Sequence, residues 1–521
     1  MTGASSSHVP PPDIADADAY RPPESLSGTV AWSLKWRLTS QLVREGSRLG
    51  VAILLARILT PEQWGIATMA LVIAAFVELI PDNMSVGLVQ RTRITEADRS
   101  TIFWTVMAMG IGLAVLGIAA SGTIAAWYGE PQVQGLFAAV SVGFAISAST
   151  SVPETLLVRK LAYRALELRQ IASVLVGGTT AVTLALAGAG PWAIIGNSLA
   201  TATTSAVLLW WFAKWRPRLI FSRSTLASLG GDGLRVMGTQ LLTLTQLYSD
   251  KLLIGRYLGA GPLGTYSFAT QIMFTPVVNI AYPVQYVLFP VFASIQEDAE
   301  RLNAAWLRTK RVSVAFMAPV FLTLLVVAPD LIRTVFGSKW EDSIPILQLL
   351  CIAGVAYSLG TQNWTLLVVR SRTGTLLALT LLTSAVVVGS IALGLMWGIR
   401  GVAAMLGVAY WTLVVPEMWI TTRAGSVRFL AAFRATLSPL PFAAAAAAAA
   451  YLFRLGLVEL DVPSAVRVVL VGAVLVLVYG GLAYVGSTPL RQEAQNAFAW
   501  LRRRRARGQD LEAEAPPDNQ A

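Results

Sequence analysis

Charged residues, histidine and cysteine are all scarce in this chain of 521 residues. Only 13% of the residues are charged, whereas a typical soluble globular protein has roughly 25%. The one histidine, His8, lies in a polar stretch, which excludes a catalytic triad, a metal site or a proton relay built on a buried imidazole. The one cysteine, Cys351, excludes an intrachain disulfide. Much of the chemistry of soluble enzymes is therefore missing.

Several ligand-binding motifs are absent as well. The chain has no Walker-type phosphate loop, no G-x-G-x-x-G after a strand and no cluster with metal-ligand spacing. We therefore expect no cofactor, no metal and no catalytic residue, and ATP-driven pumping by this chain is disfavoured. A membrane-bound polymerase or glycosyltransferase needs a sizeable outer loop, whereas the outer loops predicted here have a few residues each. The sequence therefore predicts that the protein is not an enzyme.

Long apolar stretches are what the chain does contain, and 55% of its residues are hydrophobic. Each stretch has about 18 to 30 residues, and roughly 20 residues suffice for a helix to cross the bilayer. Because lipid cannot satisfy exposed non-helical backbone, we predict an all-α polytopic membrane protein with about 14 transmembrane helices. The predicted helices are 38–59, 66–88, 101–126, 134–158, 169–187, 191–213, 233–258, 264–293, 312–336, 344–369, 375–396, 401–422, 436–453 and 464–486.

The Lys and Arg residues fall on alternate loops. Of 40 such residues, 29 lie in one set of alternate loops and termini, and only Lys339, Arg400 and Arg454 lie in the other set. Basic loops stay on the cytoplasmic side, so we predict a multi-pass membrane protein with both termini in the cytoplasm. Basic residues spread over short loops indicate topology and contact with anionic membrane lipids, and we expect no nucleic-acid partner.

An internal repeat relates helix 1 to helix 7. Adding 199 to the numbering aligns Arg57 with Arg256 and Gly65 with Gly264, among seven identities in a gapless window of thirty. A parallel repeat of six helices predicts two lobes around a central cavity, and chance similarity between apolar helices is the alternative. The predicted organisation is a disordered cytoplasmic N-terminal segment 1–34, an N-lobe 35–225 (helices 1–6), a C-lobe 226–435 (helices 7–12), helices 13–14 in 436–487, and a cytoplasmic basic tail 488–521.

Helix 1 carries the most polar face. Gln41, Arg44 and Arg48 share one side at spacings of three and four, and Glu45 lies beside them. A charge at the bilayer centre is penalised by at least about 2.5 kcal/mol, so this face should point into protein or water. We predict that it lines a substrate cavity in which the arginines attract an anionic group such as a diphosphate. A structural Glu45–Arg48 ion pair is the alternative, as is an Arg44 side chain reaching to the interface.

Helix 7, the repeat partner, carries a second polar stripe. Gln246 and Asp250 lie on one face, with Lys251 adjacent. We predict that Gln246 lines the substrate cavity and that Asp250 and Lys251 act in gating or ion coupling, with a structural Asp250–Lys251 ion pair as the alternative. Arg57 and Arg256 lie at the outer ends of the two helices, where a structural or gate-closing role is favoured over substrate contact.

Three prolines at intervals of seven residues, Pro276, Pro283 and Pro290, predict a kinked helix 8. Proline frees backbone carbonyls that neighbouring groups must satisfy in a membrane, and Asn279 and Gln285 are placed to do so. A kinked helix of this kind suits a moving gate.

Four sequence blocks carry a resemblance to a known family. They are Ala56–Gly65, Gly87–Arg91, Asp250–Gly259 and Gly264–Ala269. In these blocks the chain resembles the Wzx-type polysaccharide/oligosaccharide flippases of the multidrug/oligosaccharidyl-lipid/polysaccharide exporter superfamily, and the likeness runs through most of 35–485. The resemblance implies translocation of an undecaprenyl-diphosphate-linked oligosaccharide to the periplasmic leaflet, for exopolysaccharide or lipopolysaccharide biosynthesis. It also implies a location in the bacterial cytoplasmic (inner) membrane.

The same resemblance implies the partners. They are a lipid-linked oligosaccharide substrate, membrane lipids, and a polysaccharide polymerase with its export machinery. A drug or small-molecule/ion antiporter of the same superfamily is the alternative function, although such a protein should place more carboxylates deep in its helices than this chain does.

Overall fold

The computed structural model describes residues 26–82, 94–160, 162–493, 495 and 499. Only the backbone is described at 26–40, 42, 79–82, 224–239 and 286. Most of the predicted N-terminal segment and basic tail, and the block Gly87–Arg91, lie outside the described residues.

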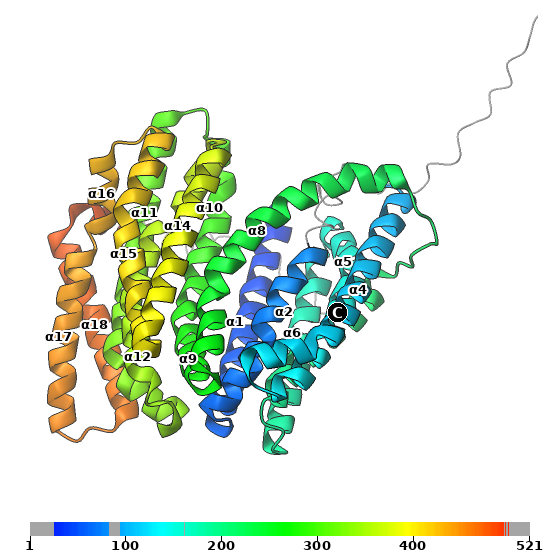
Figure 1. Cartoon of the computed structure of the whole chain (residues 1–521). Coiled ribbons are helices and arrows are strands. Elements are labelled where there is room, and N and C mark those ends of the chain that lie inside the picture. The colour runs from blue at the N-terminus through cyan, green and yellow to red at the C-terminus, as the bar shows by residue number, and fades with distance from the viewer. Residues whose placement is uncertain (1–25, 83–93, 161, 494, 496–498, 500–521) are drawn as a thin grey trace, which may run out of the picture. The chain divides into compact units, whose positions relative to one another are not determined.

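Within these ranges all regular structure is helical (Figure 1). The α-helices are α1 (Leu26–Ile58), α2 (Pro61–Asp82), α4 (Glu96–Tyr128), α5 (Gln132–Arg159), α6 (Tyr163–Leu186), α7 (Trp192–Ala213), α8 (Arg223–Leu258), α9 (Ala260–Pro276), α10 (Tyr282–Ser294), α11 (Ala299–Leu331), α12 (Ser343–Gly360), α13 (Asn363–Val369), α14 (Thr373–Gly394), α15 (Gly398–Gly425), α16 (Phe429–Leu437), α17 (Leu440–Glu459) and α18 (Ser464–Gly486). Short π or 3-10 turns are η1 (Val277–Ala281), η2 (Ile332–Phe336), η3 (Ser338–Trp340) and η4 (Leu395–Trp397).

Ten helical stretches of the described chain are long and apolar enough to cross a membrane. One of them, Thr373–Gly425, contains both α14 and α15. The predicted helices 1, 2 and 7 overlap α1, α2 and α8, which start 12, 5 and 10 residues earlier than predicted and lie outside these ten. The prediction of an all-α multi-pass membrane protein is confirmed, while the count of fourteen crossings stays a prediction.

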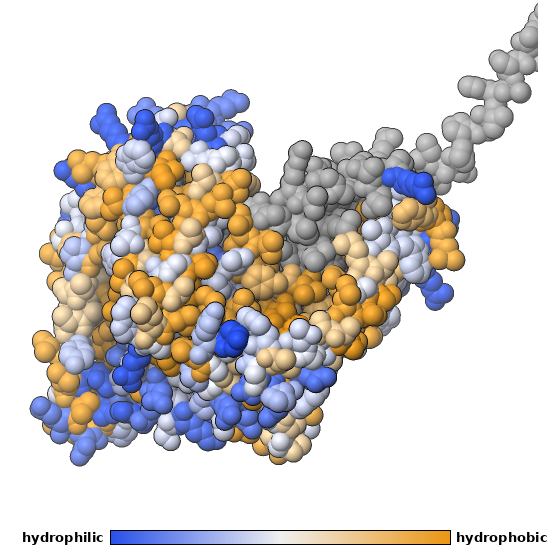
Figure 2. Space-filling view, in the orientation of Figure 1, coloured by the Kyte–Doolittle hydropathy of each residue, from blue (hydrophilic) through white to orange (hydrophobic). Residues whose placement is uncertain are grey.

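Apolar side chains lie on the outer surface of the helix bundle as well as at the interfaces between helices. On α17 and α18, Leu452, Val476 and Leu477 are all more than 60% exposed. On the face seen in Figure 2, hydrophobic residues gather over the middle of α14, α15 and α17, and hydrophilic residues lie toward both ends. Exposing such an apolar surface to water would cost free energy, whereas lipid accommodates it. The surface therefore fits a location in a membrane.

The chain divides into two compact units. The first contains Met1–Leu59 and Ile66–Leu244, and the second contains Thr60–Gly65 and Thr245–Ala521. The division at residue 225 that the sequence suggested stays a prediction. In the first unit α5 packs on α4 and α7, and α6 packs on α1 and α7.

The second unit is arranged around α11, which contacts α12, α16, α17 and α18. The start of α11 differs from the sequence prediction: the helix begins at Ala299, whereas the predicted helix began at 312. Asp298 caps this start by accepting a hydrogen bond from the Arg301 backbone N–H at 2.9 Å. The amphipathic stretch that follows buries Leu302 and Trp306, so it joins the core.

The segment Thr60–Gly65 packs closely on α9 within the second unit. Thr60 and Gln63 form a reciprocal cap at the start of α2, with distances of 3.1 and 3.2 Å. A Cβ atom on Gly65 would overlap the Ala260 carbonyl oxygen, and one on Gly264 would overlap the Pro61 carbonyl oxygen. The two contacts are reciprocal, and their residues are related by the 199-residue offset of the sequence repeat. Glycine at both places lets the helix backbones touch.

Predicted helix 8 is interrupted where its prolines suggested. A π-helical turn, η1, separates α9 from α10 directly after Pro276. The Asn279 side chain donates a hydrogen bond to the Thr275 carbonyl at 3.1 Å, one turn earlier on the same stretch. Gln285 instead reaches another helix and donates to the Thr365 hydroxyl at 3.3 Å.

Candidate functional site

Arg44 of α1 is held by α6 within the first unit. Its guanidinium donates hydrogen bonds to Glu167 and Gln170, each at 2.6 Å. The Arg44 and Glu167 side chains are 14% and 17% exposed, so the ion pair is mostly shielded from solvent. This contact joins two helices and compensates the charge of Arg44.

Arg48 lies one turn further along α1 and is far more open. Its guanidinium pairs with Glu45 at 3.1 Å, and its side chain is 57% exposed. The structural ion pair that the sequence left open is therefore present. An exposed pair of this kind contributes about 0–1 kcal/mol, so Arg48 can exchange it for another anion at little cost. Gln41 lies half-buried on the same helix.

Asp250 of α8 is buried in the second unit, at 5% exposure. Its carboxylate pairs with the ammonium of Lys251 at 3.5 Å, and the same ammonium lies 5.3 Å from the centre of the Tyr248 ring. The second alternative from the sequence, an Asp250–Lys251 ion pair, is also present. The half-buried Gln246 precedes it by one turn.

Arg57 and Arg256 end their helices as the repeat predicts. Each lies in the last turn, Arg57 of α1 and Arg256 of α8, and both are exposed. Arg256 lies 5.8 Å from the centre of the Tyr257 ring. Their gating role, and the common cavity expected between helices 1 and 7, stay predictions.

Sequence reasoning missed a buried polar cluster in the second unit. Lys310, counted among the basic loop residues, is instead 1% exposed inside α11, and its ammonium donates to the Asn363 side-chain oxygen at 2.8 Å. The Asn363 amide in turn donates to Glu417 of α15 at 3.4 Å. The signal was present as the polar triplet Thr361-Gln362-Asn363 within an apolar stretch.

A second ion cluster joins the last two helices to α11. The carboxylate of Asp330, at 1% exposure, accepts from Arg454 of α17 at 2.5 Å and from Arg467 of α18 at 2.7 and 3.0 Å. Two guanidinium groups therefore share one buried carboxylate. This cluster connects α17 and α18 to the rest of the second unit.

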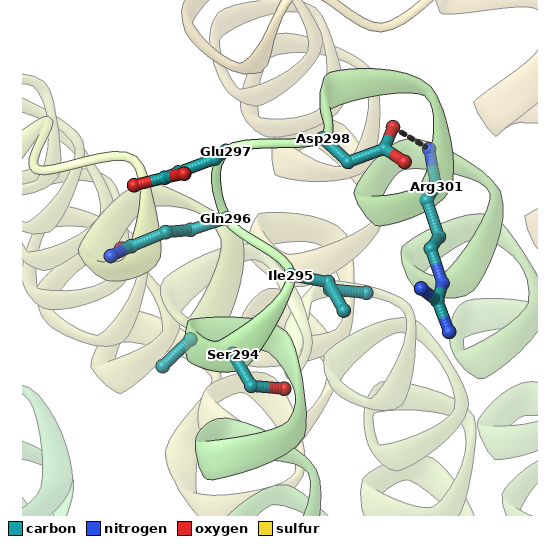
Figure 3. Close-up of a pocket in the computed structure, with 7 residues that line it drawn as sticks. Ser294, Ile295, Gln296, Glu297, Asp298 and Arg301 are labelled. Atoms are coloured by element: carbon teal, nitrogen blue, oxygen red, sulfur yellow. Dashed lines mark hydrogen bonds between the residues drawn. The ribbon is translucent and has the colours of Figure 1, made fainter.

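An open depression of about 400 Å³ lies on the loop between α10 and α11 (Figure 3). Gln296, Glu297 and Asp298 border it, and Arg301 lies at its other side. None of the site residues predicted from the sequence lines it. A depression formed by one loop at the end of the helices does not provide a path through the bundle.

Comparison with known proteins identifies the family of this chain. The family model described as "Polysaccharide biosynthesis protein" matches residues 54–345. Lipopolysaccharide biosynthesis protein WzxC of Escherichia coli (strain K12) is 27% identical over 351 residues, which cover 67% of this chain and 71% of WzxC. Teichuronic acid biosynthesis protein TuaB of Bacillus subtilis (strain 168) is 26% identical, covering 67% of this chain and 73% of TuaB.

Solved structures resemble the fold at low sequence identity. The lipid II flippase MurJ in an inward closed conformation matches with a TM-score of 0.69 and 13% identity, covering 88% of this chain and 99% of that structure. An inward-facing multidrug resistance transporter of the MATE family matches with a TM-score of 0.61 and 15% identity, covering 74% of this chain and 95% of that structure. The family model matches more than half of this chain, which therefore belongs to the polysaccharide biosynthesis protein family.

Proposed function

We propose that the protein is a flippase that moves a polyprenyl-diphosphate-linked oligosaccharide repeat unit across the cytoplasmic membrane by alternating access. The family match over residues 54–345 carries this proposal. Relatives named for lipopolysaccharide, succinoglycan and teichuronic acid biosynthesis support it. The product is a repeat unit in the outer leaflet for exopolysaccharide or lipopolysaccharide biosynthesis, where a polymerase and export machinery take it over.

The physical task is to carry a diphosphate and a sugar past hydrocarbon. The polyprenyl tail stays in lipid, while the polar head needs charged and hydrogen-bonding groups inside the protein. In our proposal the exposed Arg48 exchanges Glu45 for the diphosphate, and Gln41 on the same helix contacts the head group. Arg44, held by α6, orients this face of α1. No bond is made or broken, so no catalytic residue is required.

Gating is assigned to charges near the helix ends. Arg57 and Arg256 end α1 and α8, which the predicted topology places at the outer surface. We assign them to closing the outer side, and we assign Asp250 with Lys251 to the conformational change. Both termini face the cytoplasm in this proposal.

Deletion of the gene in its own bacterium tests the function. We expect loss of surface polysaccharide and accumulation of lipid-linked repeat units in the inner leaflet. The wild-type gene should reverse both effects. Extracted lipid-linked saccharides and surface polymer are measured together. Normal polymer combined with increased sensitivity to toxic compounds would favour the antiporter and end the flippase proposal.

A further inference from the structure

Two arginines share one buried carboxylate where α11, α17 and α18 meet. The Arg454 Nε group donates to one oxygen of Asp330 at 2.5 Å, and the Arg467 Nε and Nη2 groups donate to the other at 3.0 and 2.7 Å. Two positive charges thus meet one negative charge, so the cluster keeps one positive charge in excess. A net charge held between membrane helices is costly, and its presence indicates function.

The arginines keep hydrogen-bond donors that the carboxylate does not use. A guanidinium has N–H groups on Nε, Nη1 and Nη2, and Arg454 uses only Nε. In the described part of the chain, neither Nη group of Arg454 has a hydrogen-bond partner, and both reach the surface of the protein. The Nη1 group of Arg467 is in the same situation. These donors can bind an anion from outside the protein.

The cluster lies between an apolar layer and a polar layer. One turn toward the middle of the three helices, Val326, Ala450 and Val471 are buried in an apolar cluster. One turn toward the helix ends, the Thr334 hydroxyl donates to the Ser464 hydroxyl at 2.7 Å. A change from apolar to polar layers is expected where a membrane protein passes from hydrocarbon to head groups.

Distances along the helices agree with this position. Arg454 is five residues before the end of α17, and Arg467 is three residues after the start of α18. At about 1.5 Å per residue, they lie roughly 5–8 Å from the helix ends. The head-group region of a bilayer is about 5–8 Å thick on each side. The two guanidinium groups are therefore at the depth of lipid phosphates.

Apolar and amphipathic side chains surround the arginines on the surface. Leu455 and Val466, which adjoin them in the sequence, are both exposed. Tyr451, three residues before Arg454, is exposed as well, and tyrosine rings are typical of the membrane interface. A ligand that matches this surface has an apolar part next to its anionic group.

Other charges at this end of the helices do not balance the cluster. Glu459 and Asp461 are exposed, and neither pairs with Arg454 or Arg467. Water and salt screen such exposed carboxylates. The loops rich in Lys and Arg lie at the opposite, cytoplasmic ends of the helices in the predicted topology. A ligand of this cluster is therefore separate from lipid that contacts those loops.

We propose that Arg454 and Arg467 bind the phosphate of an anionic phospholipid such as phosphatidylglycerol. Their unused N–H groups donate charge-assisted hydrogen bonds to the phosphate oxygens, which the planar guanidinium group suits well. The acyl chains lie against the exposed apolar residues of α17 and α18. The bound lipid balances the excess charge and stabilises the packing of these two helices on α11.

Native mass spectrometry of the purified full chain in detergent counts bound lipids and tests the proposal. At the same concentration of phosphatidylglycerol, we expect the wild type to retain one molecule more than Arg454→Gln. The affinity of that site should fall about tenfold or more, because charge-assisted hydrogen bonds are lost. Arg454→Gln keeps the Arg467–Asp330 pair, which preserves the contact between α18 and α11.

Arg454→Lys is the second variant. It keeps the charge beside Asp330 but removes the planar group with its Nη donors, so it should also lose the lipid. It decides the question by the same comparison if Arg454→Gln does not fold. Size-exclusion chromatography reports whether each variant is folded.

Arg333→Gln is the matched control, because this arginine lies at the same end of α11, is 52% exposed and pairs with Glu341 at 3.1 Å. Its lipid count should equal that of the wild type. Phosphatidylcholine, whose head group is neutral overall, should show no difference between the wild type and Arg454→Gln. Inorganic phosphate at the same concentration should not displace the phosphatidylglycerol.

Two results would overturn the proposal. The first is an equal phosphatidylglycerol count in the wild type and the folded Arg454 variants. The second is displacement by inorganic phosphate, which would show that the site takes a free anion and not a lipid. Either result leaves the flippase function standing, because the measurement involves no transport.

Discussion

Two of the shielded charge clusters of this protein join different helices of the same unit. Arg44 meets Glu167, and Asp330 meets Arg454 and Arg467. The polar faces of helices 1 and 7 were predictable from spacing alone, because lipid forbids charge on its side of a helix. The partner on another helix was not predictable, since Glu167 is separated from Arg44 by 123 residues and no local pattern links them.

Removing the carboxylate of Asp330 should destabilise the protein strongly. Asp330→Asn leaves two guanidinium groups without their shared anion, and breaking a buried ion pair costs about 3–5 kcal/mol. We expect a clear fall in the thermal unfolding midpoint of the purified protein. Glu341→Gln breaks an exposed pair and should leave the midpoint within error. Equal midpoints for the two variants would contradict a structural role for the cluster.

Arg48 and Arg44 should behave differently when replaced. Arg48→Ala removes an exposed guanidinium, so folding should be unaffected, while export should fall about tenfold or more if this group binds diphosphate, since a charged hydrogen bond contributes about 1.5–3 kcal/mol. Arg44→Ala removes the mostly shielded ion pair between α1 and α6, and should lower both stability and export. Surface polymer and the unfolding midpoint are measured for each. Full export by Arg48→Ala would remove it from the substrate site.

Helix breaks were partly visible in the sequence. The turn η1 follows Pro276, as proline predicts. The break between α12 and α13 contains no proline, and it depends on long-range hydrogen bonds from Trp306 and Gln285. The early start of α11 also depends on a long-range contact. Lys310 is buried in the first part of this helix through its hydrogen bond to Asn363, which its neighbours in sequence do not reveal.

The contact of the Thr60–Gly65 segment with α9 should tolerate no larger side chain. Gly264→Leu would place atoms where the Pro61 carbonyl lies, and overpacking costs about 1–3 kcal/mol or more. We expect a large loss of folded protein by size-exclusion chromatography and a lower unfolding midpoint. Gly112→Leu on α4 is the control, because nothing lies within 4 Å of a Cβ atom there. Unfolding of Gly264→Leu at the wild-type midpoint would contradict this packing.

The whole molecule is a helical membrane protein, and its basic loops predict its orientation. Cys351 is buried, so single introduced cysteines can report which side each loop faces. Ser371→Cys, between α13 and α14, should react with an impermeant maleimide only after cells are opened. Asp461→Cys, between α17 and α18, should react in intact cells. Labelling of both in intact cells would contradict the predicted orientation.

The central claim is that this protein carries a lipid-linked oligosaccharide between leaflets. The most direct test uses vesicles that contain the purified protein and a fluorescent polyprenyl-diphosphate oligosaccharide in both leaflets, with an impermeant quencher outside. We predict that quenching proceeds beyond the outer half of the lipid in vesicles with the wild-type protein, and more slowly with Arg48→Ala. Quenching that stops at about half, as in protein-free vesicles, would contradict the account.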